Sequence, residues 1–132
     1  MKYFTLNELT RSVTAASRGI DNTPPAAAVA ALRQLVEQVL DPLREAWGRP
    51  IHVNSGYRCP ELNRLVGGVP HSQHTLGEAA DITAGSQALN RQLLALLRRL
   101  ALPVDQVIDE YGCRWLHVSY GPRHRRRYFS LP

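Results

Sequence analysis

Residues 72–82, Ser-Gln-His-Thr-Leu-Gly-Glu-Ala-Ala-Asp-Ile, contain the point at which a loop gives way to a strand. Residues 69–77 show no hydrophobic period and predict a structured loop that carries His74. Residues 79–83 are mostly small and apolar, and they predict a short strand. Asp81 is the only acid in that strand, and a carboxylate is costly to bury there without a cation or strong donors. The stretch therefore predicts a polar site around His74 and Asp81.

A strand is also predicted over residues 115–120, near the other end of the chain. Alternation along it places His117 on one face and Leu116 and Val118 on the opposite face. Residues 106–110 have the same β-rich composition, and the short glycine-containing connection between the two runs predicts a hairpin. His117 therefore faces away from the aliphatic side of the sheet.

His74, Asp81 and His117 together form a candidate ligand set. Two imidazoles and one carboxylate are the three protein ligands of a catalytic zinc site, which leaves a fourth position for water. A single histidine is more often a satisfied polar residue or an exposed one, and we expect this for the remaining histidines of the chain. Spacing alone does not decide the matter, because such a set also arises by chance.

Helices are predicted around these strands. Residues 5–8, Thr-Leu-Asn-Glu, form a capping box that predicts a short N-terminal helix. Apolar residues at three- and four-residue intervals from 29 to 47 predict the main core helix, in which Pro42 predicts a kink or a restart. Residues 60–66 predict two helical turns, and Ser86 caps a second amphipathic helix.

The composition fits one domain. The chain has 132 residues, 44% of them hydrophobic and 20% charged, which allows one core of ordinary size and argues against disorder. We therefore expect a single domain over residues 1–132 with an α+β fold, a small antiparallel sheet packed with helices. The strands are expected at residues 50–54, 79–83, 106–110 and 115–120.

The charge balance is basic, with 16 Lys and Arg against 11 Asp and Glu and a formal charge of +5. Such an excess indicates an anionic partner, which could be nucleic acid, an acidic membrane surface or cell-wall polymers. Nucleic acid is disfavoured, because the chain lacks a basic recognition helix, an aromatic platform and paired cysteines. Much of the excess lies in residues 123–132, which we expect to be a basic C-terminal tail, either solvated or a patch with affinity for the wall.

Two further features bear on the compartment. Cys59 and Cys113 are too few for a disulfide scaffold, and we expect ordinary thiols, with a single bridge between them as the alternative. Residues 1–10 lack the apolar core of a signal peptide, and no run approaches the roughly 18 apolar residues of a membrane span. We expect synthesis as a soluble product in the cytoplasm.

Several motifs follow one another along the chain in a specific order. They are Ser55-Gly56-Tyr57-Arg58, Gly67-Gly68, the stretch from Ser72 to Ile82, Asp105-Gln106-Val107-Ile108, and Trp115-Leu116-His117-Val118-Ser119. In combination they resemble the zinc-dependent D-alanyl-D-alanine carboxypeptidase family. That family includes phage endolysin peptidases and shares a metal-site fold with the hedgehog signalling domain. The resemblance covers the chain from Phe4 to Tyr120.

The resemblance implies that His74, Asp81 and His117 are the ligands of Zn²⁺. Such an ion lowers the pKa of its bound water to about 7 and polarises the scissile carbonyl. Arg58 matches the family's substrate-binding arginine, and a fixed guanidinium suits a substrate carboxylate or a developing oxyanion. Ser72 matches a serine that helps to hold the substrate. Gly77, between the first two ligands, allows the tight turn that the chain needs there.

The general base is the point at which this chain departs from the family. Some members carry an acid or a histidine three residues before the last ligand, where this chain has Arg114, which cannot accept a proton. In many phage-type relatives a glutamate follows the Asp-Gln motif at the position of Glu110. If residues 111–114 form a four-residue loop, Glu110 shares the face of His117, whereas a loop one residue longer or shorter favours Asp109.

The expected function is that of a zinc peptidase that hydrolyses peptidoglycan stem peptides. It would be a D-Ala-D-Ala carboxypeptidase or an endolysin-type endopeptidase, with Glu110 as proton shuttle and Arg58 orienting the substrate. The alternative is a catalytically silent zinc-bearing domain that binds the cell wall or a protein partner, for which Arg114 is the main support. We expect a monomer that reaches the wall after release or delivery, with a phage holin or a phage tail structure as the context.

Overall fold

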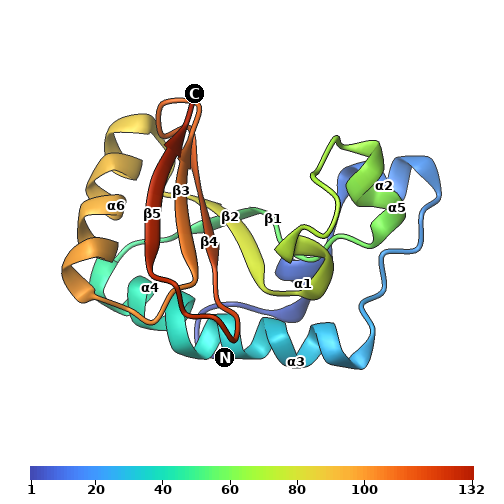
Figure 1. Ribbon diagram of the computed structural model, residues 1–132, viewed down its shortest axis with the longest axis horizontal. Coiled ribbons are helices and arrows are strands. Elements are labelled where there is room, and N and C mark those ends of the chain that lie inside the picture. Colours follow the sequence, from blue (N-terminus) through green and yellow to red (C-terminus); the bar gives the residue numbers. More distant parts are fainter.

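A five-stranded sheet with the strand order β1-β2-β4-β3-β5 forms the middle of the structure (Figure 1). The computed structural model describes residues 1–132. The strands are β1 (His52–Ser55), β2 (Ala79–Thr83), β3 (Gln106–Glu110), β4 (Trp115–Ser119) and β5 (Arg127–Leu131). Neighbouring strands are antiparallel except β3 and β5, which are parallel. The expected α+β class is therefore confirmed, although the sheet is mixed and has one strand more than the sequence predicts.

The additional strand corrects the expectation of a basic tail over residues 123–132. Arg127–Leu131 form β5 at the edge of the sheet, where Tyr128 lies opposite Val107 and packs against the core. Arg125, just before the strand, donates to both carboxylate oxygens of Asp105 at 2.8 and 2.9 Å. The segment forms a strand because it pairs with β3. Its arginine-rich composition alone does not indicate this pairing.

Eight helical segments surround the sheet. They are α1 (Leu6–Thr10), α2 (Val13–Arg18), α3 (Ala26–Leu35), the π-helical turn η1 (Val36–Leu40), α4 (Asp41–Trp47), α5 (Pro60–Leu65), the 3₁₀ turn η2 (Gln73–Leu76) and α6 (Gln87–Leu100). No helix combines the length and the apolar character that crossing a bilayer requires. Both predicted caps are present, because Thr5 Oγ1 accepts from Glu8 N at 3.2 Å and Ser86 Oγ accepts from Leu89 N at 3.1 Å.

The predicted interruption at Pro42 is also present. The helix widens into the π-turn η1 before the proline and restarts as α4, with Pro42 in its first turn. A proline is tolerated there because the first turn of a helix leaves its N–H groups unpaired in any case. Cys59 and Cys113 are free thiols, and Cys113 is buried.

The two faces of the sheet have different roles. Ile82 and Leu116 are paired on β2 and β4 and belong to the buried core, together with apolar residues of α3, η1, α4 and α6. Asp81 and His117, the next pair along the same strands, point to the opposite face. On that side of β1 the helices α2 and α5 lie together, away from α6 (Figure 1). The site described below is on this second face.

Candidate metal centre and active-site cleft

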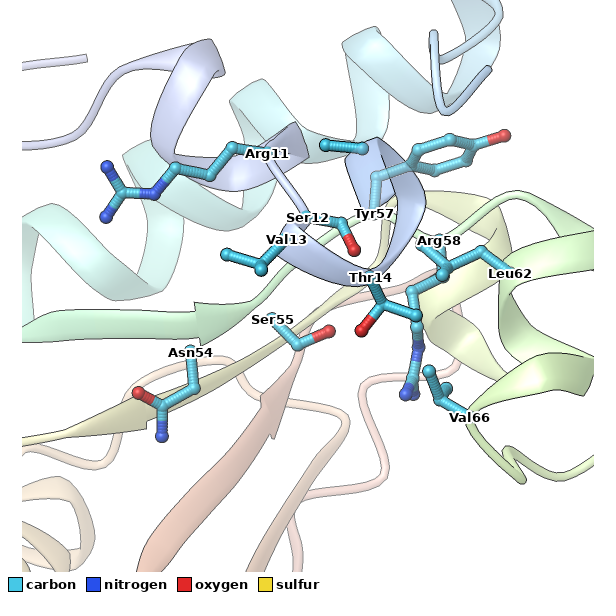
Figure 2. A pocket seen from close by; sticks show the side chains of 11 residues that line it. Arg11, Ser12, Val13, Thr14, Asn54, Ser55, Tyr57, Arg58, Leu62 and Val66 are labelled. Carbon is cyan, nitrogen blue, oxygen red and sulfur yellow. The ribbon is translucent and has the colours of Figure 1, made fainter. Parts of the chain in front are cut away.

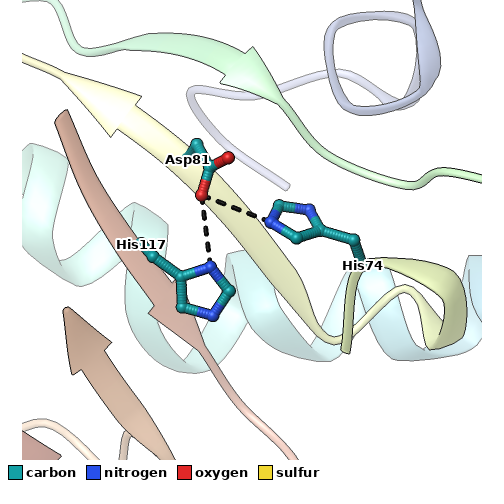
Figure 3. A group of neighbouring side chains, drawn as sticks. All are labelled: His74, Asp81 and His117. Carbon is teal, nitrogen blue, oxygen red and sulfur yellow. Dashed lines mark hydrogen bonds and ion pairs between the residues drawn. The ribbon is translucent and has the colours of Figure 1, made fainter. Parts of the chain in front are cut away.

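His74, Asp81 and His117 converge on one point (Figure 3). Asp81 Oδ1 lies 3.2 Å from His74 Nε2 and 3.2 Å from His117 Nδ1. The ligand atoms of all three residues lie within 4.8 Å of one another. Ligands at zinc-typical distances on a tetrahedron stand about 3.3 Å apart, so the two Asp81 distances fit a shared Zn²⁺. The other three histidines of the chain are exposed and do not join this cluster.

The orientation of His74 is set by a backbone carbonyl. His74 Nδ1 lies 2.7 Å from Gly56 O and donates to it, so Nε2 is the ring nitrogen that faces Asp81 and is the atom that can bind a metal. A Cβ on Gly56 would stand 2.2 Å from Leu9 O, so only glycine lets α1 pack against this turn. This role of Gly56 is not foreseen from the sequence, where the Ser-Gly-Tyr turn is its one signal.

The short turn η2, which carries His74, is held from both ends. Ser72 Oγ accepts from His74 N at 3.2 Å, and Gly77 ends the turn with a φ of 74°. Gln73 Nε2 donates to Asp105 at 2.8 Å and to Glu78 at 3.1 Å. The support from Asp105 is also missed by the sequence analysis, although an acid directly before an apolar strand is a signal of the same kind as Asp81.

The charge of Asp81 is stabilised by its neighbours. Burial disfavours the carboxylate, but hydrogen bonds with the imidazoles of His117 and His74 outweigh burial, and the net result is a pKa below the ordinary value. Asp81 is thus an anion at neutral pH, as a metal ligand must be.

Arg58 brings a positive charge close to this centre. Burial lowers the pKa of its guanidinium, while the negative charges of Asp81 and Glu110 act in the opposite direction. A guanidinium remains protonated at any physiological pH. Its Nε is buried and has no hydrogen-bond partner within the protein, so this donor is available to a ligand.

A cleft of about 410 Å³ contains all six residues that the sequence predicts for the site. Arg58, Ser72 and Glu110 line it together with the three candidate metal ligands. The wall is otherwise largely apolar. Its apolar residues are Val66, Val69, Ile108, Tyr111, Trp115 and Leu131.

The hairpin decides which acid faces the cleft. Glu110 lies opposite Trp115 across the four-residue loop 111–114, so it shares the face of His117. Asp109 lies opposite Leu116 and accepts from Ser130 Oγ at 2.7 Å, outside the cleft. The loop length that favours Glu110 is therefore the observed one.

Trp115 is a cleft residue that the sequence analysis does not single out. Its indole Nε1 is buried and has no hydrogen-bond partner within the protein. Its ring lies 5.1 Å from that of Tyr111, at 54°. The N–H is free to bind a carbonyl of a ligand in the cleft.

Comparison with known proteins assigns the chain to a family. A family model described as Peptidase M15 matches residues 2–119. The chain belongs to the peptidase M15 family. This M15 chain is 49% identical over 49 residues to a zinc D-Ala-D-Ala carboxypeptidase of Streptomyces albus G, and the match covers 36% of the chain and 19% of the relative. The match therefore spans about a fifth of the length of that relative.

Proposed function

We propose that this M15 peptidase hydrolyses an amide bond in the peptide stems of peptidoglycan, as a D-Ala-D-Ala carboxypeptidase or as an endopeptidase. The observation that carries the proposal is one cleft in which three candidate zinc ligands lie with Glu110 and Arg58. The name of the relative from Streptomyces albus G supports the substrate class.

The metal would be held by His74, Asp81 and His117. Bound Zn²⁺ supplies a Lewis acid, which activates a water molecule and polarises a carbonyl at neutral pH. The protein prepares the site in two ways. The imidazole of His74 is held in a fixed orientation, and Asp81 is already ionised, so its carboxylate need not lose a proton when the metal binds.

Glu110 is the proposed general base. Its carboxylate lines the cleft on the face of His117, where it can take the proton of the attacking water and pass it to the leaving amine. Arg58 would orient the substrate through a carbonyl or a terminal carboxylate. The Ser72 oxygen accepts from His74 N, so the hydroxyl proton of Ser72 remains free to donate to the substrate.

The alternative of a silent zinc-bearing binding domain has less support. It rests on Arg114, which stands where some family members carry the base. Arg114 is exposed and does not line the cleft, whereas Glu110 does. The site therefore has an acid in reach of a substrate without any contribution from the position of Arg114.

We place the proposed action at the cell wall, where peptidoglycan lies. Release by a phage holin or delivery with a phage tail would bring the protein to that substrate. This part of the proposal is tested by adding the protein to cells from outside with and without membrane permeabilisation, and recording lysis.

Incubation of purified muropeptides with the zinc-loaded protein tests the function directly. Mass spectrometry is expected to show loss of one terminal alanine for a carboxypeptidase, or two new peptide fragments for an endopeptidase. Glu110→Gln, which keeps the ligands and removes the base, is the matched control and is expected to yield about 100-fold less product per unit time. Unchanged muropeptides with the zinc-loaded wild type would contradict the proposal.

A further inference from the structure

A second hollow of about 530 Å³ adjoins the metal cleft at Arg58, and Figure 2 shows the side chains that line it. We call it the α2 pocket, because Ser12, Val13 and Thr14 at the start of the chain's second helical segment line it, opposite Asn54 and Ser55. Its volume lies within the range of ordinary ligand pockets, which is about 300–1,000 Å³.

The α2 pocket and the metal cleft adjoin each other. Arg58 and Val66 line both hollows. Ser55, at the end of β1, is the cross-strand neighbour of the candidate ligand Asp81. A peptide chain bound at the metal centre can therefore extend past Arg58 into the α2 pocket.

The charge of the α2 pocket is entirely positive. Arg11 and Arg58 are its only charged lining residues, with no aspartate or glutamate among the eleven. The two side chains lie toward opposite ends of the pocket in Figure 2. Arg11 is exposed and its guanidinium makes no ion pair with the protein, so its charge is free to act on a ligand.

Uncharged polar groups stand between the two arginines. The hydroxyls of Thr14 and Ser55 face this space (Figure 2), and Asn54 also lines the pocket. Ser12 differs from them, because its Oγ already accepts from Ala15 N as the cap of its helix. Guanidinium and hydroxyl donors around an acid-free hollow are the groups that bind a carboxylate.

We propose that the α2 pocket is a subsite for an acidic residue of the substrate peptide, one or more residues away from the bond that is cleaved. The inference rests on the proposed function, since it assumes a peptide substrate at the metal centre. Arg11 is then a specificity residue, which binds the carboxylate of the substrate but does not touch the reacting atoms.

Two synthetic stem peptides test the subsite. The acid peptide contains a residue with a free carboxylate, and the amide peptide is identical except that a carboxamide replaces this carboxylate. With the zinc-loaded wild type we expect kcat/KM for the acid peptide to exceed that for the amide peptide about tenfold. Arg11→Gln is expected to raise KM for the acid peptide by a similar factor, leave kcat unchanged and leave the amide peptide unaffected. Arg18→Gln is the matched control, since it removes the same charge from α2 outside the pocket and is expected to change neither peptide.

Equal kcat/KM for the two peptides, or equal effects of Arg11→Gln and Arg18→Gln, would overturn the subsite. Binding of both peptides to zinc-loaded Glu110→Gln, measured by calorimetry, separates this failure from that of the proposed function. If the wild type hydrolyses neither peptide but the acid peptide binds more tightly through Arg11, the subsite is supported and the proposed hydrolysis is contradicted. If neither is hydrolysed and Arg11→Gln changes no affinity, both proposals fall.

Discussion

Asp81 and Asp105 are both largely buried, yet their charges are balanced in different ways. Asp105 receives two hydrogen bonds from the guanidinium of Arg125, at 2.8 and 2.9 Å, and its side chain is 1% exposed. Asp81 is hydrogen-bonded only to the imidazoles of His74 and His117, at 3.2 Å, and its side chain is 15% exposed.

The guanidinium and the imidazoles differ in how fully they neutralise the carboxylate they contact. A guanidinium carries its charge at any physiological pH and matches a carboxylate with two donors, so Asp105 is complete within the protein. An imidazole can instead present the lone pair of a ring nitrogen to a metal ion. Asp81 and its two histidines together form a candidate cation site, so the comparison separates a structural carboxylate from a candidate metal-binding one.

The largest expected effect is that of Asp81→Asn on zinc binding. Loss of a direct ligand should weaken zinc affinity by more than about 100-fold, since loss of an outer hydrogen-bond partner alone costs 10- to 100-fold. The free energy of unfolding of the metal-free protein should change by less than about 1 kcal/mol, because the amide still pairs with an imidazole. A chelator competition assay and urea denaturation measure the two quantities.

Asp105→Asn is expected to give the reverse pattern. Its removal leaves Arg125 without its partner, and breaking a buried pair costs about 3 kcal/mol of unfolding free energy. At saturating zinc the variant should still bind one ion per chain. Asp109→Asn is the control, since Asp109 is only partly buried and has no arginine partner. Equal destabilisation by both substitutions would remove the distinction.

Acid titration sharpens the comparison further. The hydrogen bonds from Arg125 lower the pKa of Asp105 from 3.8 to about 2. Because the folded pKa is lower than the unfolded one, this stabilisation is present above about pH 4 and is lost as the pH falls toward 2, by about 2 kcal/mol. The metal-free wild type should therefore lose more stability than Asp105→Asn between pH 5 and pH 2. Parallel acid limbs in urea denaturation would contradict this assignment.

The smallest expected effect joins the two regions. Gln73 Nε2 donates to Asp105, and its neighbour His74 is a candidate ligand. Gln73→Ala should loosen η2 and weaken zinc affinity about tenfold, the range seen for groups that orient a ligand. Gln38→Ala is the control for the same competition assay, because Gln38 is an exposed glutamine of η1 that lies far from Gln73 in the chain. No change in zinc affinity for Gln73→Ala would show that η2 holds His74 without this support.

Much of the fold is predictable because the strands and helices have local signals. Ala79–Thr83 and Gln106–Glu110 are observed with the predicted bounds. β5 is not predictable in this way, because its arginines resemble a solvated end and its order comes from pairing with β3. An edge strand of this kind depends on a contact that its own sequence does not reveal.

The residues of the candidate site also differ in whether the sequence indicates them. The candidate ligands are indicated by residue types that suit the chemistry, and Glu110 is indicated by the family resemblance together with the alternation that assigns the face of a strand. The Gly56 carbonyl that orients His74 is a backbone group, and the partners Asp105 and Arg125 lie 20 residues apart in the chain. Such contacts depend on tertiary packing, and no residue pattern indicates them.

The central claim is that Zn²⁺ is held by His74, Asp81 and His117. X-ray absorption at the zinc edge of the zinc-loaded protein tests it most directly. We predict nitrogen and oxygen neighbours alone, at about 2.0–2.1 Å, with the outer-shell scattering of two imidazoles, one of which is lost in His117→Ala. A sulfur neighbour at about 2.3 Å, supplied by Cys59 or Cys113, or an unchanged spectrum in His117→Ala, would contradict the account.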